Sequence, residues 1–181
     1  VGWASMASRE PNAGHVAVAR LEELGLTVGV VTQNVDGLHR KAGTRALIEL
    51  HGDLALVACL RCGAREPRDH YQERLLAANP GFAPEDVPLL PDGDAAIDPE
   101  LARGFAVPAC AVCGGVMKPD VIFFGENVPR PRLEQAKAWL READALLVLG
   151  SSLAVFSGYR FVREANALGK PVAVVNHGPT R

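Results

Sequence analysis

Several features that would assign this 181-residue sequence to a specialised class are missing from it. It has no excess of basic residues, since 19 Lys and Arg against 21 Asp and Glu give a formal net charge of −2, which argues against a nucleic-acid-binding surface. No apolar run approaches the roughly 20 residues of a membrane-spanning helix, and no secretion signal is recognisable. Internal repeats and low-complexity tracts are also missing. With 48% apolar residues, the expectation is a soluble, intracellular protein of one domain with an insertion.

Cysteine is scarce, and its four copies form two C-x-x-C pairs, Cys59 with Cys62 and Cys110 with Cys113, each followed at once by glycine. This spacing lets the two thiolates of a tight turn bind one tetrahedral Zn²⁺ ion. Two disulfides are one alternative, which the missing secretion signal disfavours. A redox C-x-x-C is the other, and it would need only one pair. Because four thiolates fill the coordination sphere, the predicted zinc ion has a structural role.

The remaining sequence alternates short apolar runs with amphipathic segments. Strands are expected at residues 26–31, 120–124, 145–150 and 171–176, and helices at 11–24, 131–143 and 158–168. Asn12 is the expected cap of the first helix, and Gly25 its end. This order is typical of an α/β protein with a Rossmann-like, doubly wound parallel sheet. Seven of the 13 prolines and all four cysteines lie between its halves. We therefore predict a Rossmann-like domain of residues 1–54 and 116–181, incomplete at both ends, with a zinc-binding module inserted at 55–115.

Polar segments follow three of the predicted strands: "TQNVDGLH" after Val31, "GSSL" after Leu149 and "NHG" after Val175. In open α/β sheets, ligands bind beyond the carboxyl ends of the strands. The glycine and serines of "GSSL" would let the backbone approach a phosphate or ribose and would offer hydroxyl groups to it. One such segment alone could be only a helix cap or a turn. Three at the same edge of a sheet favour a nucleotide ligand.

One histidine is a candidate for catalysis, His51 in "ELHGDL". A lone histidine beside a glycine is more often structural, but His51 lies where the α/β part leads into the cysteine module, and a cleft is expected at that boundary. His15, His70 and His177 are assigned to structural or solvent-exposed roles. His39 is expected in the helix or turn after the first polar segment.

Taken together, these motifs resemble the sirtuin family of NAD-dependent protein lysine deacylases. The sequence carries, in order and over nearly its whole length, "TQNVDGLH", "ELHG", the two C-x-x-C pairs, "KPDVIFFGE", "GSSL" and "VVN". The segments "VGW", "PDGD", "SGYRF" and "NHGPTR" are similar to the class II branch of that family. The resemblance implies NAD and one structural zinc ion as the cofactors.

The resemblance also implies a role for each matching residue. His51 would be the general base that takes a proton from a ribose hydroxyl of NAD. The acyl oxygen of a substrate lysine would attack C1′ of that ribose, so that nicotinamide leaves and O-acyl-ADP-ribose and the free lysine result. The implied NAD-binding residues are Gln33, Asn34, Val35, Asp36, Gly150, Ser151, Ser152, Asn176, His177 and Gly178. The implied residues for the acyl-lysine and its peptide are Ile122, Phe124, Gly125, Glu126 and Val155, with residues 154–157 beside the peptide and Val121 and Phe123 in the core. The implied zinc ligands are Cys59, Cys62, Cys110 and Cys113.

Parts of the sirtuin pattern are not in this sequence. A "GAGxS" strand end and a "GIPDFR"-like loop would precede Val1, and a segment that contacts adenine would follow Arg181. The sequence is therefore expected to be a fragment of a deacylase. The alternatives are an ADP-ribosyltransferase of the same family and an inactive, truncated remnant that binds zinc or a nucleotide. The expected partners are acyl-lysine proteins or peptides, without nucleic-acid or membrane contact. A monomer is expected, in the cytoplasm if bacterial and in the mitochondrial matrix if it comes from an animal-type homologue.

Overall fold

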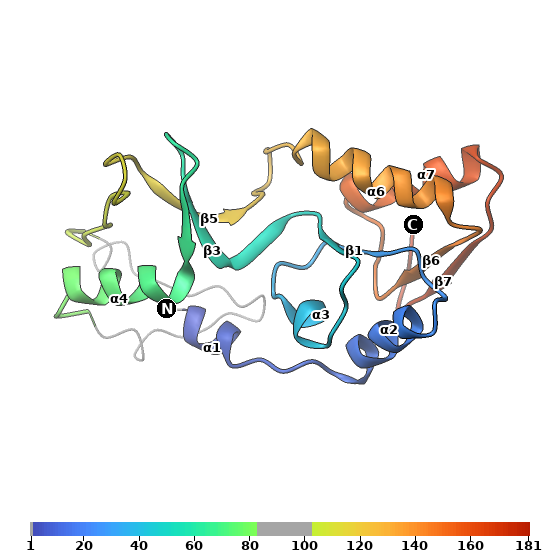
Figure 1. Ribbon diagram of the computed structural model, residues 1–181, viewed down its shortest axis with the longest axis horizontal. Coiled ribbons are helices and arrows are strands. Elements are labelled where there is room, and N and C mark those ends of the chain that lie inside the picture. The colour runs from blue at the N-terminus through green and yellow to red at the C-terminus, as the bar shows by residue number, and fades with distance from the viewer. Residues whose placement is uncertain (1, 83–102) are drawn as a thin grey trace. The chain divides into compact units, whose positions relative to one another are not determined.

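The computed structural model describes residues 2–82 and 103–181, and within them the chain forms two units (Figure 1). The cysteine unit consists of the described residues of Val1–Glu10, Val35–Leu38 and Gly52–Val121. The α/β unit consists of Pro11–Asn34, His39–His51 and Ile122–Arg181. No helix in the described part of the chain is long and apolar enough to cross a membrane. The domain boundaries drawn from the sequence stay a prediction.

The α/β unit contains two pairs of parallel strands with helices packed against them. Its helices and strands are α2 (Ala13–Glu23), β1 (Val30–Thr32), β2 (Leu47–Glu49), α6 (Arg130–Glu142), β6 (Leu146–Leu149), α7 (Phe156–Ala167) and β7 (Val172–Val175). The short helix α3 (Leu38–Lys41) lies between β1 and β2 in the chain, and it contains His39, as expected. In β1 and β2, Thr32 lies opposite Glu49. In β6 and β7, Leu149 lies opposite Val175. In each pair the carboxyl ends therefore lie at the same edge.

Helix α2 has the cap and the terminating glycine that its sequence predicts, although it is shorter than expected, at Ala13–Glu23. The Asn12 side chain accepts hydrogen bonds from the backbone N–H groups of Gly14 (2.9 Å) and His15 (3.2 Å), which would otherwise lack partners at a helix start. Gly25 ends the helix with a φ of 70°, a left-handed conformation that glycine adopts without a steric penalty. The carboxylate of Glu22 accepts from the backbone N–H groups of Arg45 (2.8 Å) and Ala46 (2.6 Å), so the end of α2 is joined to the segment that enters β2.

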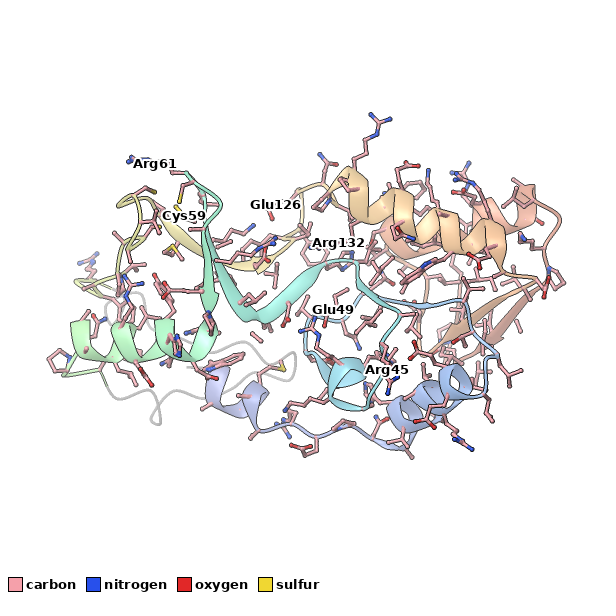
Figure 2. All side chains as sticks on the ribbon, viewed as in Figure 1. Arg45, Glu49, Cys59, Arg61, Glu126 and Arg132 are labelled. Carbon is pink, nitrogen blue, oxygen red and sulfur yellow. The ribbon has the colours of Figure 1, made fainter. Side chains whose placement is uncertain are left out.

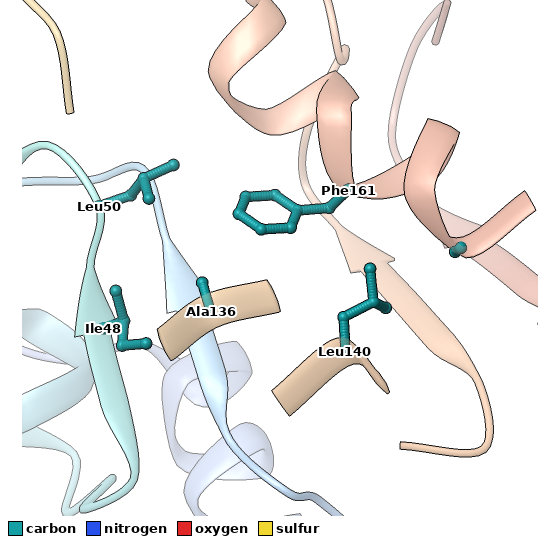
Figure 3. Packing of buried hydrophobic residues seen from close by; sticks show 6 residues of the cluster. Ile48, Leu50, Ala136, Leu140 and Phe161 are labelled. Carbon is teal, nitrogen blue, oxygen red and sulfur yellow. The ribbon is translucent and has the colours of Figure 1, made fainter. Parts of the chain in front are cut away.

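The core of the α/β unit joins both strand pairs through helices α6 and α7 (Figure 3). Its buried residues are Ile48, Leu50, Ala136, Leu140, Phe161 and Ala165. Leu50 is fully buried directly before His51, so the backbone at the candidate histidine is anchored in the core. Gly29, just before β1, lies against the indole of Trp139, where an added Cβ would come within 2.4 Å of the ring. Only glycine fits there without a shift of Trp139.

The cysteine unit is built on a three-stranded antiparallel sheet in the order β4, β3, β5. Its helices and strands are α1 (Trp3–Ala7), β3 (Gly52–Cys59), β4 (Arg65–Pro67), α4 (Arg68–Ala78) and β5 (Met117–Val121). Val57, Tyr71 and Met117 form its core together with Cys59 and Cys110. The Tyr71 hydroxyl donates to the backbone oxygen of Pro108 (2.8 Å), which holds the segment before the second cysteine pair against α4.

The strand expected at 120–124 is wrong in its position, and it does not join a parallel sheet as predicted. The structure places a strand at Met117–Val121, paired antiparallel with β3, and Ile122 to Phe124 lie outside any strand. Val121 is buried, as expected, whereas the side chain of Phe123 is half-exposed. Val121 pairs with Gly52, the first residue of β3, so the apolar run continues past the start of β3 and has no strand to pair with there.

Candidate functional site

The sulfur atoms of the two C-x-x-C pairs converge on one point at the end of β3. All four Sγ atoms lie within 4.8 Å of one another, with 3.5 Å between Cys59 and Cys113 and 3.8 Å between Cys62 and Cys110. Zn–S bonds of about 2.3 Å in a tetrahedron require sulfur atoms about 3.8 Å apart. The four cysteines therefore have the geometry of a closed tetrahedral zinc site, and the structure contains them as free thiols without disulfides.

The backbone of each turn directs N–H groups at a sulfur atom. Arg61 N–H donates to Cys59 Sγ, and Val112 N–H donates to Cys110 Sγ, both at 3.4 Å. Hydrogen bonds from the backbone N–H groups of Cys62 and Arg61 lower the pKa of Cys59 to about 6. The neighbouring sulfur atoms, Cys62 first, raise the pKa of Cys113 to about 12. A dication at their centre would let all four ionise, because its charge offsets the repulsion between thiolates.

Glycine residues shape this cluster. Gly63 and Gly114 follow the two pairs with φ angles of 73° and 70°, so each turn closes in the left-handed conformation. Gly115 faces the sulfur atoms, and a Cβ there would lie 2.8 Å from Cys59 Sγ and 3.2 Å from Cys113 Sγ. Figure 2 shows Cys59 at the end of β3, with Arg61 beyond it.

A second polar group lies in the α/β unit, at the edge where β1 and β2 end. Gln33 directly follows β1, and His51 lies two residues after β2. The Gln33 side-chain N–H donates to Ser157 Oγ (3.0 Å), and the same Oγ lies 2.8 Å from His51 Nε2. Ser157 is in the first turn of α7, the helix that follows the "GSSL" segment. The ends of β1 and β2 are thus joined to the segment that follows β6.

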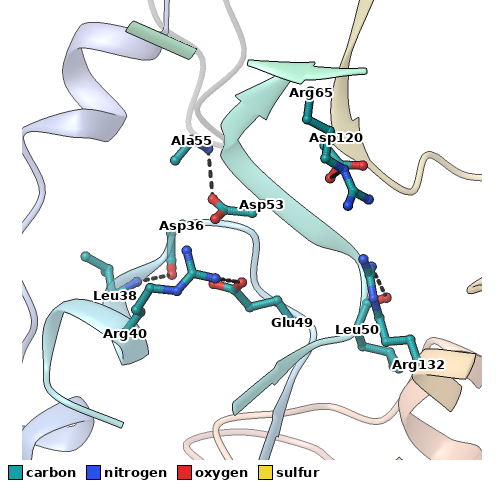
Figure 4. A network of polar contacts seen from close by, with 10 residues as sticks. All are labelled: Asp36, Leu38, Arg40, Glu49, Leu50, Asp53, Ala55, Arg65, Asp120 and Arg132. Carbon is teal, nitrogen blue, oxygen red and sulfur yellow. Dashed lines mark hydrogen bonds and ion pairs between the residues drawn. The ribbon is translucent and has the colours of Figure 1, made fainter. Parts of the chain in front are cut away.

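The surroundings of His51 favour a neutral imidazole. Burial lowers its pKa below the ordinary value of 6.5 and is the largest effect. A hydrogen bond to the backbone of Gln33 acts in the opposite direction, and the charge of Arg132 lowers the pKa further. Arg132, at the start of α6, is held nearby by a hydrogen bond from its Nη1 to the backbone oxygen of Leu50, 3.3 Å away (Figure 4). A neutral imidazole can accept a proton.

The other predicted nucleotide-binding segments of this unit lie at the carboxyl edge of β6 and β7. Gly150 N–H donates to the backbone oxygen of Val175 (2.9 Å), so the two segments start side by side. The hydroxyl oxygens of Ser151 and Ser152 accept from backbone N–H groups two residues further on. The Asn176 amide donates to Thr180 Oγ1 (2.9 Å). Gly150, Ser152, His177 and Gly178 are exposed, whereas Ser151 and Asn176 are partly buried.

The segment that contains Asn34, Val35 and Asp36 is divided between the two units. Asn34 is exposed at the end of the α/β part, with its N–H bonded to Thr32 Oγ1 (3.1 Å). Val35 and Asp36 belong to the cysteine unit, where the backbone oxygen of Val35 accepts from Leu54 N–H. One carboxylate oxygen of Asp36 accepts from Leu38 N–H (2.9 Å) at the start of α3 (Figure 4).

The residues predicted for acyl-lysine and peptide binding form an exposed turn after β5. Ile122 is partly buried, and its N–H donates to the backbone oxygen of His51 (2.7 Å). Gly125 has a φ of 90°, and the Glu126 carboxylate accepts from Phe123 N–H (2.8 Å), which closes the turn. The Phe124 side chain is 98% exposed. Val155 is also exposed, at the start of α7.

Sequence reasoning missed two residues of the His51 group, Ser157 and Arg132. Ser157 was expected beside the peptide, and Arg132 was given no role. Ser157 lies 106 residues from His51 in the chain, so no local spacing could have paired them. The sequence feature that could have indicated Ser157 is its position shortly after a polar strand end at the predicted ligand-binding edge.

Comparison with known proteins gives a family, curated relatives and solved structures. The Sir2 family model matches residues 3–157. The chain is 53% identical over its full length to NAD-dependent protein deacetylase 1 of Streptomyces coelicolor, of which it covers 60%. It is 48% identical, again over its full length, to the human mitochondrial NAD-dependent protein lipoamidase sirtuin-4, of which it covers 58%. The chain thus spans about 60% of the length of these relatives.

Solved structures confirm the predicted fold class. A Sir2 structure described as a complex with a p53 peptide and NAD⁺ matches 97% of this chain with a TM-score of 0.76 and 32% identity, over 62% of that chain. A Sir2 structure bound to an acetylated peptide matches 97% of this chain with a TM-score of 0.74 and 32% identity, over 63% of that chain. The fold is therefore α/β of the Rossmann-like type.

Proposed function

Given that this chain belongs to the Sir2 family, we propose that it forms the larger part of an NAD-dependent protein lysine deacylase. Such an enzyme releases nicotinamide and O-acyl-ADP-ribose and leaves the lysine free. The names of the curated relatives, which include a deacetylase and a lipoamidase, support this class of reaction. The proposed substrates are proteins or peptides with an acylated lysine, in line with the peptide named in the matching structures. The proposed compartments are the cytoplasm or the mitochondrial matrix.

The observation that carries the proposal is the group formed by His51, Ser157 and Gln33. It places a neutral imidazole at the carboxyl edge of a parallel strand pair, where nucleotides bind in this type of sheet. Within the proposal, His51 takes a proton from a ribose hydroxyl of NAD. Gln33 and Asn34 orient the nicotinamide-side ribose, and the segments after β6 and β7 hold the rest of the dinucleotide.

The four-cysteine cluster fits a zinc ion that stabilises the fold without a part in the reaction. Four thiolates leave no coordination position for water or substrate, so the ion cannot activate a nucleophile. Cys59 and Cys110 are buried in the core of their unit, and their sulfur atoms accept hydrogen bonds from backbone N–H groups. Zinc bound there would link the end of β3 to the segment before β5.

Nicotinamide release by the full-length gene product tests the proposed function. Peptides with acetyl, longer dicarboxylic and lipoyl groups on one lysine would each be incubated with NAD, with the unmodified peptide as the control. We expect release that depends on the acyl group, together with recovery of the free lysine peptide. ADP-ribosylated peptide as the main product would favour the transferase alternative. No turnover with any acyl peptide would overturn the proposal.

The pH dependence of nicotinamide release is expected to reflect the lowered pKa of His51. A general base works in its neutral form, so the acid limb of kcat/KM should have its midpoint below 6.5. Arg132→Gln removes a positive charge that disfavours the imidazolium ion, so it should move this midpoint to higher pH. Arg130→Gln, an exposed position on the same helix, is the matched control and should leave the profile unchanged. If the midpoint is the same in Arg132→Gln and in the wild type, this account of the His51 pKa is contradicted.

Gly158→Ala is expected to separate ligand binding from stability. A Cβ at Gly158 would lie 2.5 Å from Gln33 Oε1, and the flexible Gln33 side chain must then move away. Because alanine is the better helix former, the free energy of unfolding should stay the same or rise by up to about 1 kcal/mol. The KM for NAD should rise several-fold, which steady-state kinetics and urea unfolding can measure together. An unchanged KM would show that the Gln33 amide does not contact NAD.

A further inference from the structure

The hydroxyl group of Ser157 lies between two polar side chains of the α/β unit, those of Gln33 and His51. The amide N–H of Gln33 donates to Ser157 Oγ (3.0 Å), so this oxygen already serves as an acceptor. A hydroxyl has one proton to donate. The His51 Nε2 atom, 2.8 Å away, is positioned to receive it. Nε2 accepts from this hydroxyl when the ring proton is on Nδ1, whereas a proton on Nε2 would make the hydroxyl oxygen the acceptor through its second lone pair.

We propose that Ser157 is a positioning residue that holds His51 in one tautomer, with the proton on Nδ1 and the lone pair on Nε2. The proposal rests on the proposed role of His51 as the general base. It goes further by naming the atom that accepts the proton and the residue that prepares it. Neutral histidine has two tautomers, and the partner of one ring nitrogen decides which is present. Here Ser157 is that partner.

A second contact of the ring agrees with this tautomer. His51 hydrogen-bonds the backbone of Gln33, and this contact raises its pKa, as expected when a carbonyl oxygen accepts a ring N–H. Since Nε2 faces Ser157, the donated proton is the one on Nδ1. Gln33 thereby makes two contacts in this arrangement, with its side chain to Ser157 and with its backbone to the ring. The ring is fixed at both nitrogens.

The serine is held by rigid parts of the fold. It lies in the first turn of α7, and Phe161, one turn further along, is buried in the core of the α/β unit. Gly158 leaves room for the Gln33 amide, which any side chain at that position would displace. Ser157, Gln33 and His51 are all partly buried. Arg132 is the charged group that acts on the ring in the described part of the unit, and it too disfavours the imidazolium form.

The arrangement has a chemical consequence for the proposed reaction. When a ribose hydroxyl replaces the Ser157 hydroxyl at Nε2, its O–H bond breaks and an Nε2–H bond forms. The ring becomes an imidazolium ion, and the oxygen keeps the electron pair. The Nδ1 proton, bonded to the Gln33 backbone, supports the new positive charge. A ring in the other tautomer would present an N–H to the ribose and could not accept its proton.

Nitrogen NMR of the histidine rings tests the proposal directly. In full-length ¹⁵N-labelled protein, the Nε2 resonance of His51 should lie downfield, where ring nitrogens without a proton resonate. The Nδ1 resonance should lie upfield, where protonated ring nitrogens resonate. Ser157→Ala should mix the tautomers and raise the His51 pKa by roughly half to one unit, because a hydrogen bond to the neutral ring is lost. Ser157→Thr, which keeps the hydroxyl, should restore the wild-type spectrum. Ser8→Ala, which removes an exposed serine hydroxyl in the cysteine unit, is the matched control.

Kinetics of nicotinamide release add a second readout. Ser157→Ala is expected to lower kcat/KM about 5- to 10-fold near pH 7 and to move the acid limb upward, and Ser157→Thr should recover both. A wild-type Nε2 that carries a proton, or ring resonances that Ser157→Ala leaves unchanged, would overturn the role of Ser157 while the deacylase function stands. Full turnover by a His51→Ala variant would instead overturn the base assignment on which the proposal rests.

Discussion

Replacement of Cys59 by serine is expected to release the zinc ion and unfold the cysteine unit. Cys59 ends the central strand β3 and is buried together with Val57, Tyr71 and Met117, so its loss affects both the metal site and the core. Structural zinc in small domains contributes about 10–16 kcal/mol of binding free energy at neutral pH, far more than this small core can replace. Metal analysis should find about one zinc ion per wild-type chain and far less in the variant. Circular dichroism should show the accompanying loss of folded structure.

The matched control for Cys59→Ser is Val112→Ala. Val112 lies between the two cysteines of the second pair, and its side chain is 76% exposed, while its N–H donates to Cys110 Sγ through the backbone. The control therefore keeps all four thiolates and the N–H···S bond, and it should bind zinc and unfold like the wild type. A wild-type protein that is well folded and free of metal would refute the zinc assignment. Equal stability of Cys59→Ser and Val112→Ala would refute its structural role.

The parts of this molecule that could be predicted from the sequence are those set by near neighbours in the chain. The Asn12 cap reaches N–H groups two and three residues away, and Gly25 ends the helix by its own φ angle. The same is true of each C-x-x-C turn, in which two sulfur atoms are placed by a few backbone angles. In such cases the residue types carry enough information, because the interaction is complete within one turn.

The strand pairing could not be predicted in the same way. The apolar run that contains Val121 and Phe123 fits a buried strand. Its partner β3 lies some 60 residues earlier in the chain, and the register between β3 and β5 determines where β5 ends. Gly52 carries part of this information. A Cβ there would lie 2.0 Å from the backbone oxygen of Asp120, so the two backbones approach as only glycine allows. The sequence alone does not indicate which segment packs against Gly52.

The candidate site shows the same division. Polar residues at strand ends identified Gln33 and His51, because parallel strands bring their carboxyl ends to one edge. Ser157 and Arg132 reach His51 from helices α7 and α6, and only the packing of those helices on the core places them there. Residues that contact a candidate catalytic group only through tertiary packing carry no motif of their own. The fold is needed to find them.

Replacement of His51 by alanine is expected to abolish acyl removal while the fold remains. Loss of a general base commonly lowers turnover about 10²- to 10⁴-fold. In the described part of the chain, the side chains that contact Ser157 Oγ besides Ser157 itself are those of His51 and Gln33, and the Gln33 amide cannot act as a base in place of His51. The fold should survive because the adjacent Leu50, which is fully buried, carries the packing at this point. The measurement is nicotinamide release from NAD and an acyl peptide by the full-length gene product, with urea unfolding in parallel.

The control for His51→Ala is His70→Ala, which removes an exposed imidazole on α4 in the cysteine unit. It should release nicotinamide like the wild type. If His51→Ala keeps its turnover, the base lies elsewhere and the assignment fails. If it loses turnover but still binds NAD with a wild-type dissociation constant, the imidazole acts on the chemical step. That outcome is the one expected from a ring that burial and the charge of Arg132 hold in the neutral form, ready to accept a proton.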